Sequence, residues 1–406
     1  MAALDGMRVL DMTQYEAGTS CTQWLAWLGA DVVKVEPPMG DPGRGVGRGT
    51  DHTQYFMNYN GNKRSIVLNL KHEGARRTLL DLAPHFDVFV ENYGPGVIEG
   101  FDLGYERLRE ANPRLIYGRI KGFGLSGPYA NYNSYDWVAQ AAAGAFSVTG
   151  DPSGPPMHAG ATMGDSGTGL QMALAITAAY HQRERTGEGQ LIEISMQEAV
   201  TVFMRTVGNR LWGQEPAPRT GVDQGNPPTS TYPCKGGGPN DWVYIMVTTQ
   251  RMWDALCTAM GTPELTLDPR FDSVEARIAH RDEMYDLVSS WTRTLGKFEV
   301  MDILGPVGVP CSAVFDTLDL WNDRHLKERD FIQTVQHPVV GPVELMRNPI
   351  RMSGSEVPLA PSPLLGEHTD EVLASVLGLS TAEIEALRAE GAIGPALEVA
   401  AAAQGG

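Results

Sequence analysis

The sequence has little of several features that would mark a specialised class of protein. It contains only four cysteines in 406 residues, and none of them are spaced as Cys-x-x-Cys, which disfavours a disulfide scaffold or a zinc ribbon. The nine histidines form neither HxxxH nor HExxH, so we expect no metal site. No run approaches about 18 consecutive apolar residues, and we therefore expect no membrane-spanning helix and no membrane partner.

Basic residues are also scarce. The 32 Lys and Arg are outnumbered by 49 Asp and Glu, which gives a formal net charge of −17. Such a chain repels nucleic acid unless its cations gather in a patch, and no run of Lys and Arg suggests one. The opening MAALDGMRVLDM lacks a basic stretch followed by an apolar one, so we expect a cytoplasmic protein with reduced thiols.

The first 125 residues alternate between short apolar runs and segments with helical spacing. Strands are predicted at 7–11, 31–36, 65–69, 87–91 and 115–121, and helices at 17–28, 72–82 and 105–110. This alternation predicts parallel strands with right-handed crossovers, in a doubly wound α/β domain. Ligands of such domains bind beyond the carboxyl ends of the strands.

The rest of the chain changes composition twice. A long helix at 166–185, a strand at 190–195 and a helix from 197 to about 212 come first. From Gln214 a stretch rich in Pro and Gly predicts a linker. A strand at 242–247, helices at 250–260 and 277–293 and a strand at 309–314 then indicate a smaller domain. From about Lys327 the pattern is irregular, with late elements near 369–377 and 382–390.

The phosphate-binding signatures of this fold class are missing. The first strand-to-helix turn, residues 13–19, lacks GxGxxG, and the chain has no Walker A motif. The stretch 43–49 carries alternating glycines and two arginines and is predicted to be a flexible surface loop. Contact with an anionic ligand is the alternative, because Gly-rich basic loops can form anion nests.

Six cations lie near predicted strand ends: Lys34, Lys63, Arg64, Lys71, Arg119 and Lys121. Most are predicted to be solvated surface charges. Lys71 directly follows a strand's carboxyl end, where ligands of this fold class sit.

Asp165 stands at the start of the long helix, between Gly164 and Gly167. One interpretation is structural, because Asp is a preferred helix N-cap, and spacing alone favours it. The other is catalytic: the positive end of the helix dipole keeps a carboxylate ionised, and small neighbours leave room for an electrophile. Such a carboxylate can form a covalent intermediate.

Three consecutive glycines, Gly236, Gly237 and Gly238, follow Lys235. Composition favours a linker turn here. The alternative is a mobile lid over a reactive intermediate, since glycine supplies the required backbone freedom.

Taken together, several ordered motifs resemble CoA-transferase family III, which includes formyl-CoA:oxalate and carnitine CoA-transferases. The motifs are VLDMTQYEAG with CTQWLAWLGADVVKVEPP, NKRSIVLNLK, VENYGPGV, IKGFGLSGPY, GDSGTGLQMALAITAAYHQRERTGEGQLIEISMQEAV, VGVPCSAV and PLLGEHTDEVL. They run nearly end to end, which is far more specific than any single motif.

The resemblance implies a fold and partners. A Rossmann-like large domain would be built from both chain ends, residues 1–213 and 327–406, with a linker and a smaller α+β domain at 214–326. Two ring-like chains would thread each other as an interlocked homodimer. The implied substrates are an acyl-CoA and a free carboxylic acid, with no resident cofactor.

The resemblance also implies a mechanism, with Asp165 as the nucleophile. Its carboxylate attacks the thioester, giving an aspartyl–acyl anhydride and CoA thiolate, which returns to form an aspartyl-CoA thioester. The acceptor acid attacks that thioester, and CoA then takes the new acyl group. Because anhydrides hydrolyse readily, the site must exclude water. This is the implied role of Gly236, Gly237 and Gly238, which match the family's glycine loop loosely.

CoA contacts carry over to Glu16, Ala17, Lys71, Asn92, Tyr93 and Gly94. Two positions depart from the formyl-CoA transferase pattern. Glu16 stands where that enzyme has glutamine, which puts a small-acid pocket in question. Gly100 stands where it has arginine, which removes one phosphate partner.

Two other functions stay open as alternatives. Related enzymes racemise α-methylacyl-CoA thioesters with a histidine that Tyr135 replaces here. A phenol of pKa about 10 is a poor general base at neutral pH, so transfer is favoured over racemisation. A non-catalytic CoA-binding protein ranks below both, since Asp165 and its two glycines are present.

Overall fold

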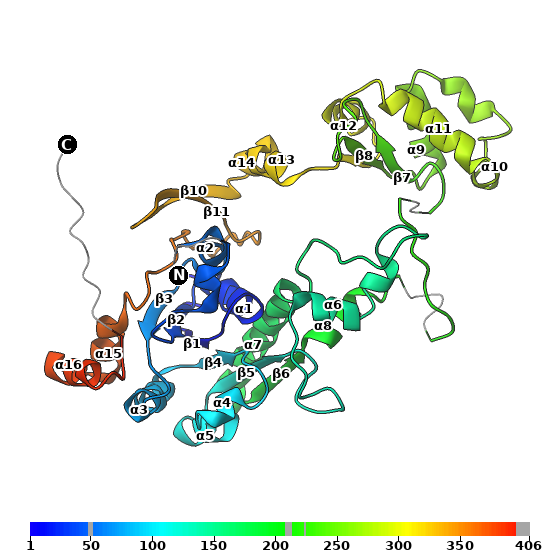
Figure 1. The fold of residues 1–406 in the computed structure, drawn as a ribbon. Helices are drawn as coiled ribbons and strands as arrows, with labels where there is room; N and C mark the ends of the chain where they lie inside the picture. The colour runs from blue at the N-terminus through cyan, green and yellow to red at the C-terminus, as the bar shows by residue number, and fades with distance from the viewer. Residues whose placement is uncertain (48–51, 208–212, 223–224, 395–406) are drawn as a thin grey trace, which may run out of the picture. The chain divides into compact units, whose positions relative to one another are not determined.

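The computed structural model describes residues 1–47, 52–207, 213–222 and 225–394. The chain divides into two compact units. The larger unit comprises Met1–Phe146, His158–Pro216 and Asp330–Gly406, and the smaller comprises Ser147–Met157 and Ala217–Arg329. Both ends of the chain therefore contribute to the larger unit, and most of the smaller unit is one insertion (Figure 1).

A six-stranded sheet forms the centre of the larger unit. Its strands are β1 (Arg8–Met12), β2 (Asp31–Glu36), β3 (Arg64–Val67), β4 (Val88–Glu91), β5 (Ile116–Lys121) and β6 (Leu191–Ser195). They lie in the order β3-β2-β1-β4-β5-β6, and every neighbouring pair is parallel. The prediction of a doubly wound α/β sheet is confirmed. The order reverses between β1 and β4, and this switch point is where such sheets open a ligand crevice.

Alternate residues of each strand face opposite layers of helices, because side chains of a strand point to the two faces in turn. Val9, Val32 and Val90 belong to the core formed with α1 (Ala17–Trp27) and α7 (Ser166–Thr186). The opposite core contains Leu10 and Phe89 and is covered by α3 (Glu73–Leu82), α4 (Val97–Gly100), α5 (Tyr105–Ala111), α15 (Thr369–Leu377) and α16 (Thr381–Ala389). The two C-terminal helices thus complete the second face.

Helices α1 and α7 lie side by side in very close contact (Figure 1). Gly169 makes the approach feasible: a Cβ there would lie 2.6 Å from the Ala17 carbonyl oxygen and 2.9 Å from the Cys21 nitrogen. The start of α7 is therefore held against the start of α1.

The larger unit also contains α2 (Gln54–Asn60), α6 (Asp136–Ala142), α8 (Met196–Phe203) and the antiparallel hairpin of β10 (Ile332–His337) and β11 (Gly341–Met346). Short 3-10 turns occupy Pro42–Gly45, Ala83–His85, Phe146–Val148 and Pro263–Leu267. No helix among the described residues is long and apolar enough to cross a bilayer.

The smaller unit has its own sheet and core. Strands β7 (Ser230–Pro233), β8 (Trp242–Ile245) and β9 (Cys311–Ala313) form an antiparallel sheet packed around the buried Trp253. Its helices are α9 (Gln250–Ala259), α10 (Val274–Ala279), α11 (Arg281–Thr292), α12 (Lys297–Leu304), α13 (Thr317–Asn322) and α14 (Arg324–Glu328).

Four expectations about single elements were wrong. The predicted helix 277–293 is interrupted at His280, whose backbone (φ −113°, ψ 34°) separates α10 from α11. β7 lies inside the predicted linker, and the β10–β11 hairpin lies in the segment expected to be irregular. The predicted helix 197–212 ends as an α-helix at Phe203, and residues 208–212 lie outside the described residues.

Candidate active site

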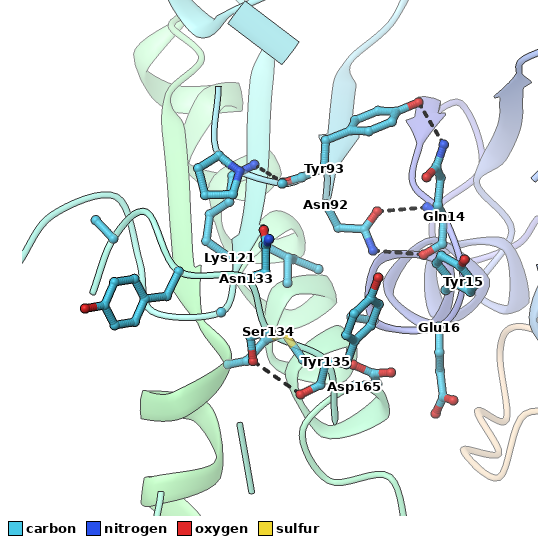
Figure 2. Close-up of a pocket in the computed structure, with 18 residues that line it drawn as sticks. Gln14, Tyr15, Glu16, Asn92, Tyr93, Lys121, Asn133, Ser134, Tyr135 and Asp165 are labelled. Atoms are coloured by element: carbon cyan, nitrogen blue, oxygen red, sulfur yellow. Dashed lines mark hydrogen bonds between the residues drawn. The ribbon is translucent and has the colours of Figure 1, made fainter. Parts of the chain in front are cut away.

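The turns after β1 and β4 are tied together at the switch point of the sheet. The Asn92 side chain accepts a hydrogen bond from the Gln14 N–H (2.8 Å) and donates one to the Gln14 carbonyl oxygen (2.9 Å), as Figure 2 shows. The Gln14 amide also donates to the Tyr93 hydroxyl (3.3 Å). These bonds fix the backbone of both turns at the mouth of the crevice.

A cavity of about 280 Å³ opens between these turns. Seven of the residues predicted for the site line it together: Glu16, Ala17, Asn92, Tyr93, Gly94, Tyr135 and Asp165 (Figure 2). Lys71 does not line it, and its side chain is exposed at the turn after β3. The residues come from segments up to 149 positions apart, and the fold brings them to one edge of the sheet.

Asp165 occupies the N-cap position of α7 but does not cap it. Its backbone has φ −86° and ψ −72°, and its side chain makes no capping hydrogen bond. The Asp136 side chain instead fixes the residues just before the helix, since its Oδ1 accepts from the N–H groups of Gly164 (2.7 Å) and Asp165 (3.0 Å). The structural interpretation of Asp165 as the helix cap is therefore wrong, and its carboxyl group is left for the cavity.

The surroundings of Asp165 favour its neutral form. Burial raises the pKa of its carboxyl group to about 8, and the nearby carboxyl groups of Glu16 and Asp136 add to the rise. The expectation that the helix terminus keeps this group ionised is wrong for the free chain. That expectation counted the helix dipole but could not include burial and two neighbouring acids, which become visible only in the fold.

Glu16 is buried beside Asp165, and Ser166, the residue after Asp165, holds its side chain. The Ser166 hydroxyl donates a 2.7 Å hydrogen bond to Glu16 Oε1. The Tyr59 hydroxyl interacts with the side chains of Glu16 and Ser166. Burial, together with the charge of Glu16, raises the pKa of Tyr59. The turn after β1 thus carries an acidic group into the neighbourhood of the candidate nucleophile.

Tyr15, just before Glu16, has a strained backbone. Its φ of 58° lies in the left-handed region that non-glycine residues rarely adopt. The Asp41 carboxylate accepts a 3.1 Å hydrogen bond from its N–H, and its ring packs edge-on against Tyr135 with centroids 6.2 Å apart. Such strain is retained where the surroundings over-determine it, often at functional sites.

Most of the candidate cations are buried in ion pairs, so the prediction of solvated surface charges is wrong for them. Lys34 pairs with Asp41 (2.8 Å) and Lys63 with Asp11 (3.1 Å), and all four side chains are almost fully buried. Arg119 and Lys121 both pair with Glu91. A buried charge needs a partner, and these pairs lock the strand ends that carry the site.

The glycine-rich stretch 43–49 starts as a buried 3-10 turn. Arg44 forms two 2.7 Å hydrogen bonds to Glu36 and is itself buried. The prediction of a flexible loop is therefore wrong for its first residues, and the Arg44 guanidinium is engaged within the protein. Arg48 lies outside the described residues.

The three-glycine run forms a tight turn between β7 and β8 of the smaller unit. Gly236 and Gly237 have φ values of 118° and 74°, and the Asp241 carboxylate accepts from the Gly238 N–H (2.8 Å). A Cβ on Gly236 would lie 2.3 Å from Asp241 Oδ2. The backbone therefore requires glycine here, and the role of a lid stays a prediction.

Sequence reasoning missed Asp136, Ser166 and Tyr59. Asp136 and Ser166 are the sequence neighbours of two singled-out residues, Tyr135 and Asp165, and a hydroxyl or carboxyl so placed was a usable signal. Tyr59 lies on α2, a short helix without a clear apolar period, and no local signal pointed to it.

Comparison with known proteins settles the family. The model of CoA-transferase family III matches residues 4–369. The chain belongs to CoA-transferase family III. It is 41% identical to the formyl-CoA:oxalate CoA-transferase of Streptomyces avermitilis, over 96% of this chain and 99% of that protein. It is 38% identical to the enzyme of that name from Rhodopseudomonas palustris strain BisA53, over 98% and 99%.

Solved structures agree with this transferase family. A CAIB/BAIF family protein from Brucella suis superposes with a TM-score of 0.84 at 31% identity, over 92% of this chain and 99% of that one. Rv3272 from Mycobacterium tuberculosis superposes with a TM-score of 0.79 at 27% identity, over 91% and 98%. The family match favours transfer over the racemase alternative.

Proposed function

We propose that this transferase moves CoA from an acyl-CoA thioester to a free carboxylic acid through covalent intermediates on Asp165. The observation that carries the proposal is the Asp165 carboxyl group. It makes no capping hydrogen bond to α7, and Asp165 lines the cavity at the switch point of the sheet. Asp136 binds the backbone N–H groups of Gly164 and Asp165 and so positions Asp165. The Asp165 carboxyl group itself makes no capping hydrogen bond to the helix.

The reaction proceeds by four exchanges at carbonyl carbons. The ionised Asp165 attacks the thioester carbonyl, the C–S bond breaks, and an anhydride and CoA thiolate result. The thiolate attacks the aspartyl carbonyl, which releases the donor acid and leaves an aspartyl-CoA thioester. The acceptor carboxylate attacks that thioester and expels the thiolate again. The thiolate finally takes the new acyl group and regenerates the Asp165 carboxylate.

CoA lies with its thioester at Asp165 and its pantetheine arm along the turn after β4. Ala17, Asn92, Tyr93 and Gly94 line the cavity that leads there. Lys71 projects into solvent at the carboxyl end of β3, where a cation can meet a phosphate. The pantetheine arm needs no pocket of large side chains, because backbone groups and small side chains can hold it.

Water exclusion completes the proposal. The anhydride intermediates hydrolyse unless the site closes. The turn of Gly236, Gly237 and Gly238 is the proposed cover, supplied within an interlocked homodimer. Glycines at φ values of 118° and 74° allow the backbone to approach a ligand without Cβ atoms.

The experiment is a CoA-exchange assay with a panel of donor thioesters and acceptor acids. Wild-type protein should transfer CoA to at least one acid, and Asp165→Ala should abolish transfer to every acid. An active Asp165→Ala variant would refute the covalent route. Deuterium appearing at the α-carbon in D₂O without any acceptor acid would instead indicate isomerisation.

A further inference from the structure

A second cavity of about 470 Å³ borders the first turn of α7 in the larger unit. Trp24, Trp27, Tyr59 and Phe203 contribute aromatic walls, and Leu170 an aliphatic one. Ser166, which also lines it, donates the hydrogen bond to Glu16 in the first cavity. Ser166 lines this cavity, and its sequence neighbour Asp165 lines the first one.

The walls suit an apolar body of aryl or branched-alkyl size. Trp24 and Trp27 meet edge to face with centroids 5.3 Å apart, an arrangement that offers ring faces and edges to a guest. No Lys, Arg, Asp or Glu is found among its described lining residues. A second carboxylate on the guest would have no cation to meet there.

Gln23 gives this cavity a polar feature that the protein leaves unused. Its side chain lines the cavity and is 2% exposed. Within the described part of the chain, neither its amide nitrogen nor its amide oxygen has a hydrogen-bond partner, and the Trp27 indole N–H also lacks one. A buried amide without a partner destabilises a fold, and its presence calls for an explanation such as a ligand.

We propose that this second cavity binds the body of the acceptor acid, a monocarboxylic acid with an aryl or branched skeleton that carries a hydroxyl or amide group facing Gln23. The assignment rests on the proposed function, since it places the acid's carboxylate at Asp165. The Gln23 amide both donates and accepts, so a neutral group of the same kind satisfies it. Oxalate, named for the relatives, would leave the cavity empty and meet Glu16 with its second charge.

The first test fills the cavity. With acetyl-CoA as donor, 4-hydroxyphenylacetate and acetate are compared as acceptors for wild type, Leu170→Trp and the matched control Leu174→Trp. Leu174 lies one turn further along α7, is 71% exposed and does not line the cavity. Leu170→Trp should lower kcat/KM for the larger acid at least ~10-fold and change acetate less than about 2-fold. Equal losses with both acids, or losses in the control as well, would overturn the assignment.

The second test removes the unused amide. Gln23→Leu keeps the volume and should raise Tm, because an unpaired buried amide is lost. It should lower kcat/KM for 4-hydroxyphenylacetate about 10-fold relative to phenylacetate. A purely structural Gln23 would give the opposite pattern, a lower Tm with both acids affected alike.

The acid panel separates failure of the pocket from failure of the transferase mechanism. Suppose that wild type prefers oxalate or acetate to every aryl or branched acid, and that Asp165 still forms a covalent adduct during turnover. The pocket assignment is then overturned and the covalent route stands. If no acid accepts CoA and Asp165 stays unlabelled, the covalent route fails and the pocket assignment fails with it.

Discussion

The surroundings of Asp165 disfavour the ionised form of its carboxyl group. Burial and the two neighbouring acids raise its pKa to about 8. Because this pKa lies above neutral pH, the free enzyme holds its nucleophile largely protonated at pH 7. Only the ionised form attacks a thioester. Asp165→Asn should lower kcat at least ~10³-fold, because loss of a nucleophile removes the covalent route.

The same carboxyl group affects stability. It keeps its proton up to a pKa of about 8 in the fold, whereas the ordinary Asp value is 3.8. The folded state therefore binds more protons between these values, and its stability falls as pH rises through this window. Asp165→Asn removes the effect, so the variant's Tm should exceed that of wild type by more at pH 9 than at pH 5. A Tm advantage that shrinks with pH would contradict this.

Glu16 is the next residue to test. It is the larger of the two acidic contributions to the raised pKa of Asp165. Glu16→Gln removes that charge and should lower the pKa, which moves the acid limb of the kcat/KM profile to lower pH. Glu73→Gln is the control, since Glu73 is exposed and pairs with Arg77 on α3. A profile that does not move in Glu16→Gln, or moves equally in the control, would refute the coupling.

At the scale of elements, the contact of α1 and α7 sets the distance between the turn after β1 and Asp165. Gly169→Ala would place a Cβ 2.6 Å from the Ala17 carbonyl oxygen. We expect a loss of about 1–3 kcal/mol in the free energy of unfolding from this overpacking. Gly100→Ala is the control, because a Cβ there meets nothing within 4 Å. Urea unfolding measures both, and equal stabilities would contradict the close-packing argument.

The elements also show what a sequence can and cannot predict. β2 and α7 follow from a continuous apolar run and from a long helical period, which need only local information. The break at His280 and the short strands β7, β10 and β11 carry no such signal. Their pairing depends on partners distant in the chain or on turn geometry.

At the scale of the whole molecule, a buried ion network holds the sheet ends on which the site stands. Lys63 Nζ reaches Asp11, Thr22 and Asn60, and it also donates to the Thr19 carbonyl oxygen. Lys63→Met would leave Asp11 buried without this partner, and we expect a loss of about 3–5 kcal/mol in unfolding free energy. Lys71→Met, at an exposed position, should change it by less than about 0.5 kcal/mol.

The network also predicts sensitivity to acid. Although burial opposes it, Lys63 and Lys34 hold the pKa of Asp11 at about 2, below its ordinary 3.8. The stability from this group is present above the ordinary value and is lost as pH falls through the folded value. Urea midpoints should therefore drop between about pH 4 and pH 2, and drop less in Asp11→Asn. A midpoint independent of pH in wild type would contradict this.

The candidate site was predictable only in part, and for whole-molecule reasons. Family resemblance pointed to Asp165, and the fold's switch point explains why Glu16 and Asn92 line the same cavity. The acidity of Asp165 and the backbone bonds from Asp136 arise from segments that meet only after folding. Burial of Lys34 and Lys63 is likewise invisible in a local window, where both read as surface charges.

The central claim is tested most directly by trapping the intermediate. Enzyme is mixed with acyl-CoA, quenched during turnover with hydroxylamine and digested, and the peptide containing residue 165 is weighed by mass spectrometry. The covalent route predicts an aspartyl hydroxamate at that residue, formed only when acyl-CoA is present. Sustained transfer of CoA with this peptide always unmodified would contradict it.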